Sequence, residues 1–138
     1  MIKITPEVRV YLAAIAEIGE HIGETAREYG IASSKLPNGI EEIRKAKDEY
    51  LRLLKDFELQ EESLLQIDAP DSLKREHSNI NQSYSKYVVS TETSISALDI
   101  ENVTVNEELL EEAQRLQVEA AQEIVEVSND VVKKFVPE

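Results

Sequence analysis

No glycine or proline occurs between Asp71 and Val136, a stretch close to half of the 138-residue chain. Chains rich in β-strands need turn residues about every 8–12 positions, and glycine and proline supply many of them. Their absence over such a length therefore favours long helices. Apart from Pro137, the remaining glycines and prolines all lie at or before Pro70.

Apolar residues recur at intervals of three and four positions in four segments, the pattern of one buried helix face. In the second segment, Ile43, Tyr50, Phe57 and Leu64 repeat every seven residues. The predicted helices span about 6–29, 40–67, 70–98 and 107–135. The sequence thus predicts an all-α fold, a single domain over residues 1–138 that forms an antiparallel up-down-up-down four-helix bundle. Two helical hairpins that pair across a dimer would give the same pattern.

Five positions are expected to set the helix boundaries. Thr5, Asn38 and Asn106 carry side chains that cap helix N-termini well. Gly30 is expected to end the first helix, because glycine readily adopts the conformation that follows a helix C-terminus. Pro70 is expected to open the third helix, since proline is favoured in a first turn.

One segment, residues 88–96, has the composition of a poor helix former. It is rich in β-branched and hydroxyl side chains, which lower helix propensity. The apolar spacing of the third helix continues through it, so we expect it to be helical and to be the softest part of the bundle.

Charge and composition exclude several classes of function. The chain has 28 acidic and 15 basic residues, a formal net charge of −13. Binding to nucleic acid or to an anionic membrane surface needs clustered basic residues, so neither is expected. The apolar runs are too short for a membrane-spanning segment. The chain has no cysteine, which rules out disulfides, thiol catalysis and cysteine-based metal sites.

The sequence contains no metal-binding pattern of the kind found in helical bundles. A di-iron site needs Glu-x-x-His on two helices, but Ile18 and Lys74 stand three residues before the two histidines. The closest set of candidate ligands lies on one predicted helix: Glu17, Glu20, His21 and Glu24. These residues lie outside the apolar face, and we interpret them as a solvated surface, with a weak divalent-ion site as the alternative.

His77 lies on the apolar face of the third predicted helix. A lone histidine there is interpreted as a structural residue, whose ring reaches a hydroxyl or carboxylate on a neighbouring helix. The sequence shows no nucleophile–base pair, no glycine-rich phosphate loop and no nucleotide-binding pattern. The chain is therefore expected not to be an enzyme and to need no metal or other cofactor.

Two features are candidate interaction sites. The first predicted helix carries a row of mostly small residues that includes Gly19 and Gly23, explained either by tight packing inside the bundle or by a flat face for a partner helix or a second copy. The fourth begins with a cluster of acidic residues that includes Glu108, Glu111 and Glu112, explained either by solubility or by an acidic band for a basic partner.

Segment 67–77, followed by Tyr84 and Tyr87, resembles a pattern in small helical extracytoplasmic proteins of Gram-positive bacteria, many of them uncharacterised lipoproteins. In that pattern Pro70 opens a helix and His77 follows about two turns later. The resemblance covers about a fifth of the chain. It implies a secreted or membrane-tethered helical domain of unassigned function, with no catalytic residues to transfer.

The start of the chain departs from that resemblance. Met1 is not followed by a signal peptide or by a lipidation cysteine, so either the protein is cytoplasmic or its natural leader has been replaced. The first functional hypothesis is a non-enzymatic domain that binds another protein outside the membrane of a Gram-positive bacterium. The alternative is a small acidic cytoplasmic regulator, of the phage or mobile-element type, whose glutamate-rich fourth helix occupies a basic target.

Overall fold

The computed structural model describes residues 3–135. It is all-helical apart from one very small sheet, as the sequence predicts. The elements, in chain order, are α1 (Pro6–Ala32), α2 (Ile40–Gln66), a 3₁₀ turn η1 (Asp71–Leu73), α3 (Lys74–Ser96), β1 (Leu98–Asp99), β2 (Thr104–Val105) and α4 (Glu107–Phe135).

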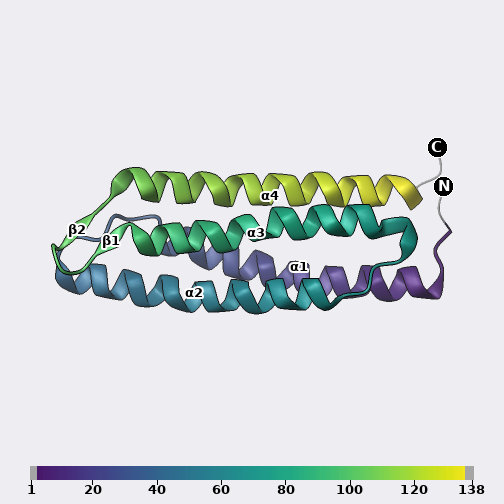
Figure 1. Cartoon of the computed structure of the whole chain (residues 1–138), viewed down its shortest axis with the longest axis horizontal. Helices are drawn as coiled ribbons and strands as arrows, with labels where there is room; N and C mark the ends of the chain where they lie inside the picture. Colours follow the sequence, from purple (N-terminus) through teal and green to yellow (C-terminus); the bar gives the residue numbers. More distant parts are fainter. Residues whose placement is uncertain (1–2, 136–138) are drawn as a thin grey trace.

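The four long helices lie side by side along the long axis of the molecule (Figure 1). In that view α4 lies along the top, α2 along the bottom, and α3 and α1 between them. The main helix contacts join α1 to α2, α2 to α3, and α3 to α4. The α1–α2 connection and the small sheet lie at one end, and the α2–α3 connection and both chain termini lie at the other.

The seven-residue repeat of α2 forms the centre of the core. Ile43, Tyr50, Phe57 and Leu64 are each at most 2% exposed, which confirms the predicted buried face. The ring of Phe57 stacks on that of Tyr87 from α3, with centroids 5.1 Å apart. Burial of such large side chains supplies most of the driving force for helix packing.

A second, smaller cluster closes the end at which the chain termini lie. Its buried members are Val8, Tyr11, Ala69, Leu73 and Val131. They come from α1, from the α2–α3 connection and from α4. This cluster therefore holds the first turns of α1 against the last turns of α4.

The hydroxyl-rich segment of α3 is helical, as predicted, and its composition has a packing reason. Ser90, Thr91 and Ser94 are fully buried. Ser90 donates to the carbonyl oxygen of Ala113 on α4 at 2.6 Å, and the hydroxyls of Ser94 and Tyr29 lie 2.7 Å apart. Small side chains let α3 and α4 approach closely, and their hydroxyls are satisfied within the core.

Two of the predicted caps are present. The Thr5 hydroxyl accepts a hydrogen bond from the backbone N–H of Val8 at 3.2 Å, and the Asn106 side chain accepts one from the N–H of Leu109, also at 3.2 Å. The predicted cap at Asn38 is wrong. Gly39 occupies that position with φ of +86° and provides no side-chain bond.

The other predicted boundaries also need correction. α1 continues through Gly30 to Ala32, because Ser33 rather than Gly30 satisfies the last carbonyls through its N–H. Pro70 does not open α3. The N–H of Leu73 bonds to the Pro70 carbonyl at 2.8 Å, which forms the 3₁₀ turn, and α3 then spans only Lys74–Ser96.

The second connection contains the small sheet, which the sequence analysis does not predict. Leu98 pairs with Val105, and Asp99 with Thr104, in antiparallel register. The Asp99 carboxylate accepts hydrogen bonds from the backbone and side chain of Asn102, and these bonds stabilise the turn between the strands.

Candidate interaction face

The glycines of α1 do not pack inside the molecule. A Cβ atom built on Gly19, Gly23 or Gly30 would meet no atom within 4 Å, and all three glycines are exposed. The expectation of tight packing at this row is therefore wrong. The larger apolar residues of α1, such as Ile22 and Tyr29, face the core, and the small row lies beside them.

Contacts with α2 show which side of α1 the small row occupies. Gln60 of α2 donates to the Thr25 hydroxyl at 2.8 Å, and Arg52 reaches Glu28 at 3.4 Å, so these positions of α1 face α2. At about 100° per residue, Gly19 and Gly23 lie on the other side of the buried face. They therefore point away from α2, toward the side on which α4 lies.

A matching row of exposed apolar residues lies on α4. Val118, Val125 and Val132 are 56%, 58% and 57% exposed and follow one another at intervals of seven. Gln114 belongs to the same side of the helix, and its Nε2 donates to the backbone oxygen of Ser33, just after α1, at 3.0 Å. This bond shows that the valine row faces the α1 side.

These two rows form what we call the α1–α4 face, whose central members are all exposed: Ala16, Gly19 and Gly23 on α1, and Val118, Ala121 and Val125 on α4. It is bounded at one end by the Gln114–Ser33 bond and at the other by the cluster of Tyr11 and Val131. Within residues 3–135, α1 and α4 are not among the pairs of helices with extensive contacts. Side chains of both helices, such as Ile22 and Val127, belong to the same core cluster, and the two exposed rows lie outside that core.

Gln117 lies at the inner edge of this face, three residues after Gln114 and four before Ala121. It is 8% exposed, and its Nε2 has no hydrogen-bond partner within the described part of the chain. A buried donor without a partner costs about 1–3 kcal/mol. The Nε2 atom is shielded from solvent as well as unpaired, so the protein carries this cost in its interior.

The negative charge of the protein is concentrated on the two helices that border the face. α1 and α4 together carry 13 acidic and 5 basic side chains, a net charge of −8. α2 and α3 carry 10 acidic and 8 basic side chains, a net charge of −2. The sequence analysis notes the acidic start of α4 but not this unequal distribution between helix pairs.

Of the three acidic candidate residues on α4, the structure places only one in line with the valine row. Glu111 lies seven residues before Val118 and so continues the valine row, whereas Glu108 and Glu112 lie on other sides of α4. A hydrogen bond from Arg115 keeps the pKa of the Glu112 carboxyl below its ordinary value. Sequence analysis missed the exposed valines, although their seven-residue repeat beside the buried row was a readable signal.

His77 lies in a buried polar cluster near the chain termini. Its Nε2 lies 3.0 Å from the Leu64 carbonyl oxygen, which can only accept, so Nε2 donates. Its Nδ1 then accepts from the Tyr11 hydroxyl at 2.9 Å. Both ring nitrogens are therefore engaged, in keeping with a structural role for His77.

A carboxylate–ammonium pair lies beside this cluster. Lys134 of α4 contacts the Glu76 carboxylate of α3 and also donates to the Ser72 carbonyl at 3.1 Å. Burial of Glu76 disfavours its charged form, but the hydrogen bond and charge of Lys134, a backbone N–H and the charge of Arg75 together outweigh this effect and leave the pKa of Glu76 below its ordinary value. The pair fastens the last turns of α4 to the start of α3.

The acidic residues around His21 lie on the surface. Glu17, Glu20, His21 and Glu24 are all exposed, as expected for a solvated helix face. Across residues 3–135, no three histidine or carboxylate side chains form a group that could hold a metal ion.

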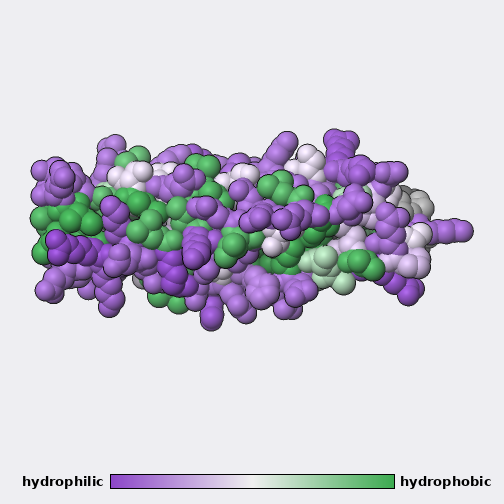
Figure 2. All heavy atoms as spheres, turned by 60° about the horizontal axis from the view of Figure 1, so that its bottom comes forward, coloured by the Kyte–Doolittle hydropathy of each residue, from purple (hydrophilic) through white to green (hydrophobic). Residues whose placement is uncertain are grey.

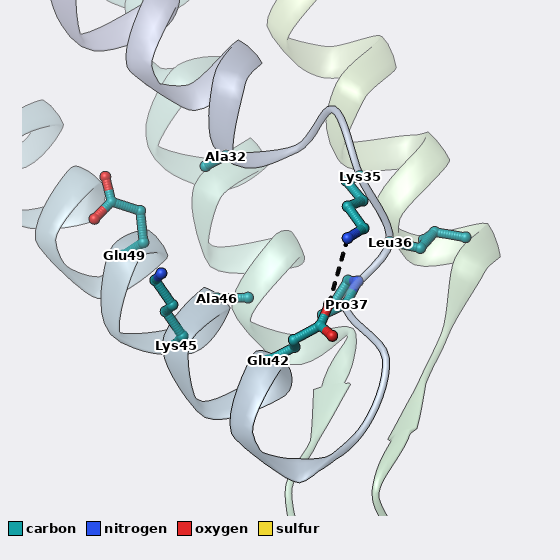
Figure 3. A pocket seen from close by; sticks show the side chains of 8 residues that line it. All are labelled: Ala32, Lys35, Leu36, Pro37, Glu42, Lys45, Ala46 and Glu49. Atoms are coloured by element: carbon teal, nitrogen blue, oxygen red, sulfur yellow. Dashed lines mark ion pairs between the residues drawn. The ribbon is translucent and has the colours of Figure 1, made fainter.

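A shallow pocket lies at the α1–α2 connection (Figure 3). It has a volume of about 390 Å³, and its lining residues are Ala32, Lys35, Leu36, Pro37, Glu42, Lys45, Ala46 and Glu49. Lys35 pairs with Glu42 at 4.0 Å across its rim. The charges of its two lysines and two glutamates balance, and its lining contains no serine, threonine, cysteine or histidine.

Hydrophobic side chains on the surface occur in patches among hydrophilic ones, and one patch lies at the left end of the view in Figure 2. In the described part of the chain, no helix is both long and apolar enough to cross a membrane. No family model, no curated protein and no solved structure matches this chain.

Proposed function

We propose that this chain is a non-enzymatic protein-interaction domain, an antiparallel up-down-up-down four-helix bundle that receives a segment of another protein on its α1–α4 face. The observation that carries the proposal is the exposure of Val118 and Val125 on α4, together with α1 glycines that have open space around them. The engagement of both His77 nitrogens in the core supports a role that does not depend on acid–base chemistry.

The energetics of the face also support binding. Full burial of a valine side chain contributes about 1.5–3 kcal/mol, so covering two or three half-exposed valines favours association appreciably. Glycine and alanine on α1 allow another backbone to approach closely. Interior helical glycines cost about 0.8–1 kcal/mol each relative to alanine, and a close approach by a partner explains why Gly19 and Gly23 are present.

The proposal also concerns the cellular compartment in which the protein acts. The resemblance of segment 67–77 to extracytoplasmic helical proteins supports a partner outside the membrane of a Gram-positive bacterium. The concentration of negative charge on α1 and α4 favours the second candidate, an acidic cytoplasmic regulator with a basic target. The intact mass and location of the native protein in its source cells distinguish the two: a cleaved leader or added lipid supports the first, and an unmodified cytosolic chain supports the second.

The interaction itself is tested by capture from those cells with three forms of the protein. Val125→Asn changes the α1–α4 face, and Val89→Asn makes the same change at an exposed position of α3. We expect a protein that is retained by the wild type and by Val89→Asn but lost with Val125→Asn. Equal retention by all three forms, or retention of nothing, would overturn the proposal.

A further inference from the structure

The connection between α1 and α2 contains the only asparagine of the chain that is followed by a glycine, Asn38–Gly39. The side-chain amide of an asparagine can react with the backbone nitrogen of the next residue, and a glycine hinders that reaction least because it has no Cβ atom. The other five asparagines all precede residues with larger side chains: Asn79, Asn81, Asn102, Asn106 and Asn129. Asn38 therefore has the least hindered neighbouring nitrogen.

The structure leaves both reacting groups of this pair free. Asn38 and Gly39 are exposed and lie just before Ile40, the first residue of α2. Asn38 forms one hydrogen bond within residues 3–135, from its backbone N–H to the Glu42 carboxylate at 3.4 Å. Within the same residues, its side-chain amide and the Gly39 N–H have no partner. Nothing there holds the Cγ of Asn38 away from the Gly39 nitrogen.

The backbone of Gly39 explains why a glycine follows Asn38. Its φ of +86° lies in the region that strains any residue with a Cβ atom. A Cβ built on it would meet no atom within 4 Å, so the space around the residue is open. The same glycine that the turn into α2 requires thus leaves its own nitrogen unshielded.

The structure restrains the other asparagines. Three of them lie inside α3 or α4, where the N–H of the following residue takes part in helical hydrogen bonding: Asn79, Asn81 and Asn129. The Asn102 amide donates to the Asp99 carboxylate at 2.7 Å. The Asn106 side chain caps α4 by accepting from the N–H of Leu109. Asn38 thus differs from all of them in both its neighbour and its surroundings.

We propose that Asn38 is a site of spontaneous deamidation, an inference that goes beyond the proposed function. The Gly39 nitrogen attacks the Cγ of Asn38, its proton passes to the amide group that leaves as ammonia, and a cyclic succinimide forms. Water then opens the ring at one of two carbonyl carbons. Breaking the new bond between Cγ and nitrogen gives aspartate, and breaking the original backbone bond gives isoaspartate.

The modification changes the end of the molecule that contains the α1–α2 connection. Either product adds one negative charge next to Glu42, whose carboxylate accepts from the N–H of residue 38. Isoaspartate also lengthens the backbone by one methylene group immediately before the cap of α2. Leu36, Pro37 and Glu42 line the pocket shown in Figure 3, so the reaction alters the border of that pocket.

The test follows the loss of the amide in the full-length protein. The protein is aged at mildly alkaline pH, both folded in buffer and unfolded in guanidinium chloride, and is then digested with trypsin. Cleavage after Lys35 and Arg44 releases segment 36–44, in which Asn38 carries the only side-chain amide. Mass spectrometry measures the conversion, chromatography separates isoaspartate from aspartate, and Asn38→Asp supplies the aspartyl standard. An unaged sample corrects for conversion during digestion.

We expect Asn38 in the folded protein to convert faster than any other asparagine and to give both products. Because the folded structure leaves the pair exposed, the rate should lie within about tenfold of the rate in the unfolded chain. Gly39→Ala should slow conversion about tenfold in both states, since its Cβ hinders the attack. Gly30→Ala, the same change near the end of α1, should leave the rate unchanged.

Three results would each overturn the proposal. The first is a segment 36–44 that keeps its amide during ageing or loses it no faster than Asn102 does. The second is conversion more than about tenfold slower in the folded protein than in the unfolded chain, which would show that the fold protects Asn38. The third is undiminished conversion in Gly39→Ala, which would exclude attack by the nitrogen of residue 39.

Discussion

The Tyr11 hydroxyl donates a hydrogen bond to Nδ1 of His77 over 2.9 Å, and the two rings meet edge to face with centroids 5.4 Å apart. This contact joins α1 to α3, and the bond from Nε2 to the Leu64 carbonyl extends it to α2. One histidine thus links three helices near the chain termini.

Removing the Tyr11 hydroxyl is expected to destabilise the protein. Tyr11→Phe leaves Nδ1 of a buried histidine without a partner, which costs about 1–3 kcal/mol. His77→Phe removes the acceptor from the tyrosine, and the double variant should be less destabilised than the sum of the two single variants. Urea unfolding of the four proteins measures this coupling. Additive effects would show that the hydrogen bond contributes nothing specific.

The tyrosines are expected to resist ionisation in the folded protein. Burial raises the pKa of all five, to about 12 for Tyr11 and Tyr50. Because the folded values exceed the unfolded value of about 10, the stabilisation is complete below pH 10 and is lost as the pH rises through the folded values.

An alkaline titration that records tyrosinate absorbance together with helicity tests whether the tyrosines resist ionisation. The chain contains no tryptophan, so the signal belongs to tyrosine alone. We expect ionisation and loss of helix to occur together. Ionisation of several tyrosines near pH 10 with the helices intact would contradict the burial of these side chains.

The Glu76–Lys134 pair is expected to contribute to acid sensitivity. The folded pKa of Glu76 lies below its ordinary value, so its stabilisation is present above an unfolded pKa of about 4.3 and is lost as the pH falls through the folded value. Lys134→Gln should lower the unfolding free energy at neutral pH by about 1–2 kcal/mol and flatten its dependence on acidic pH. Lys133→Gln, its exposed neighbour, serves as the control and should change little.

Filling the glycines of α1 is expected to stabilise the free protein. Gly19→Ala and Gly23→Ala should each add about 0.8–1 kcal/mol, because the new methyl group meets nothing within 4 Å. Gly39→Ala is the contrasting change, since φ of +86° strains any other residue, and it should destabilise. Thermal unfolding of the three variants measures the difference. Destabilisation by Gly23→Ala would mean that another helix packs against this position in the isolated chain.

Much of the helical structure could be predicted from local sequence. The seven-residue repeat of Ile43 to Leu64 and the cap at Thr5 depend on neighbours within a few residues, so sequence spacing reveals them. The predicted end of α1 at Gly30 and the predicted start of α3 at Pro70 were wrong. Both helix boundaries depend on which backbone groups form hydrogen bonds in the connections. The presence of a glycine or a proline does not decide that alone.

The candidate site likewise combines features that the sequence reveals with features that depend on the tertiary structure. The small row at Gly19 and Gly23 and the valine repeat at Val118 and Val125 are visible in the sequence. Their exposure is not, because it depends on which sides of α1 and α4 the neighbouring helices cover. The link from Gln114 to Ser33 and the unpaired Gln117 likewise arise from residues far apart in the chain.

The sequence by itself determined the helices, the buried row on each and the net negative charge, because these follow from side-chain chemistry and helix periodicity. Only the tertiary structure decided that the glycines of α1 and the valine row of α4 lie exposed. Close packing of α3 on α4 through Ser90 and Ala113, and of α1 on α2 through Thr25 and Gln60, fixes the helix positions. Gly19 and Gly23 of α1 and Val118 and Val125 of α4 are left outside the core that these contacts form.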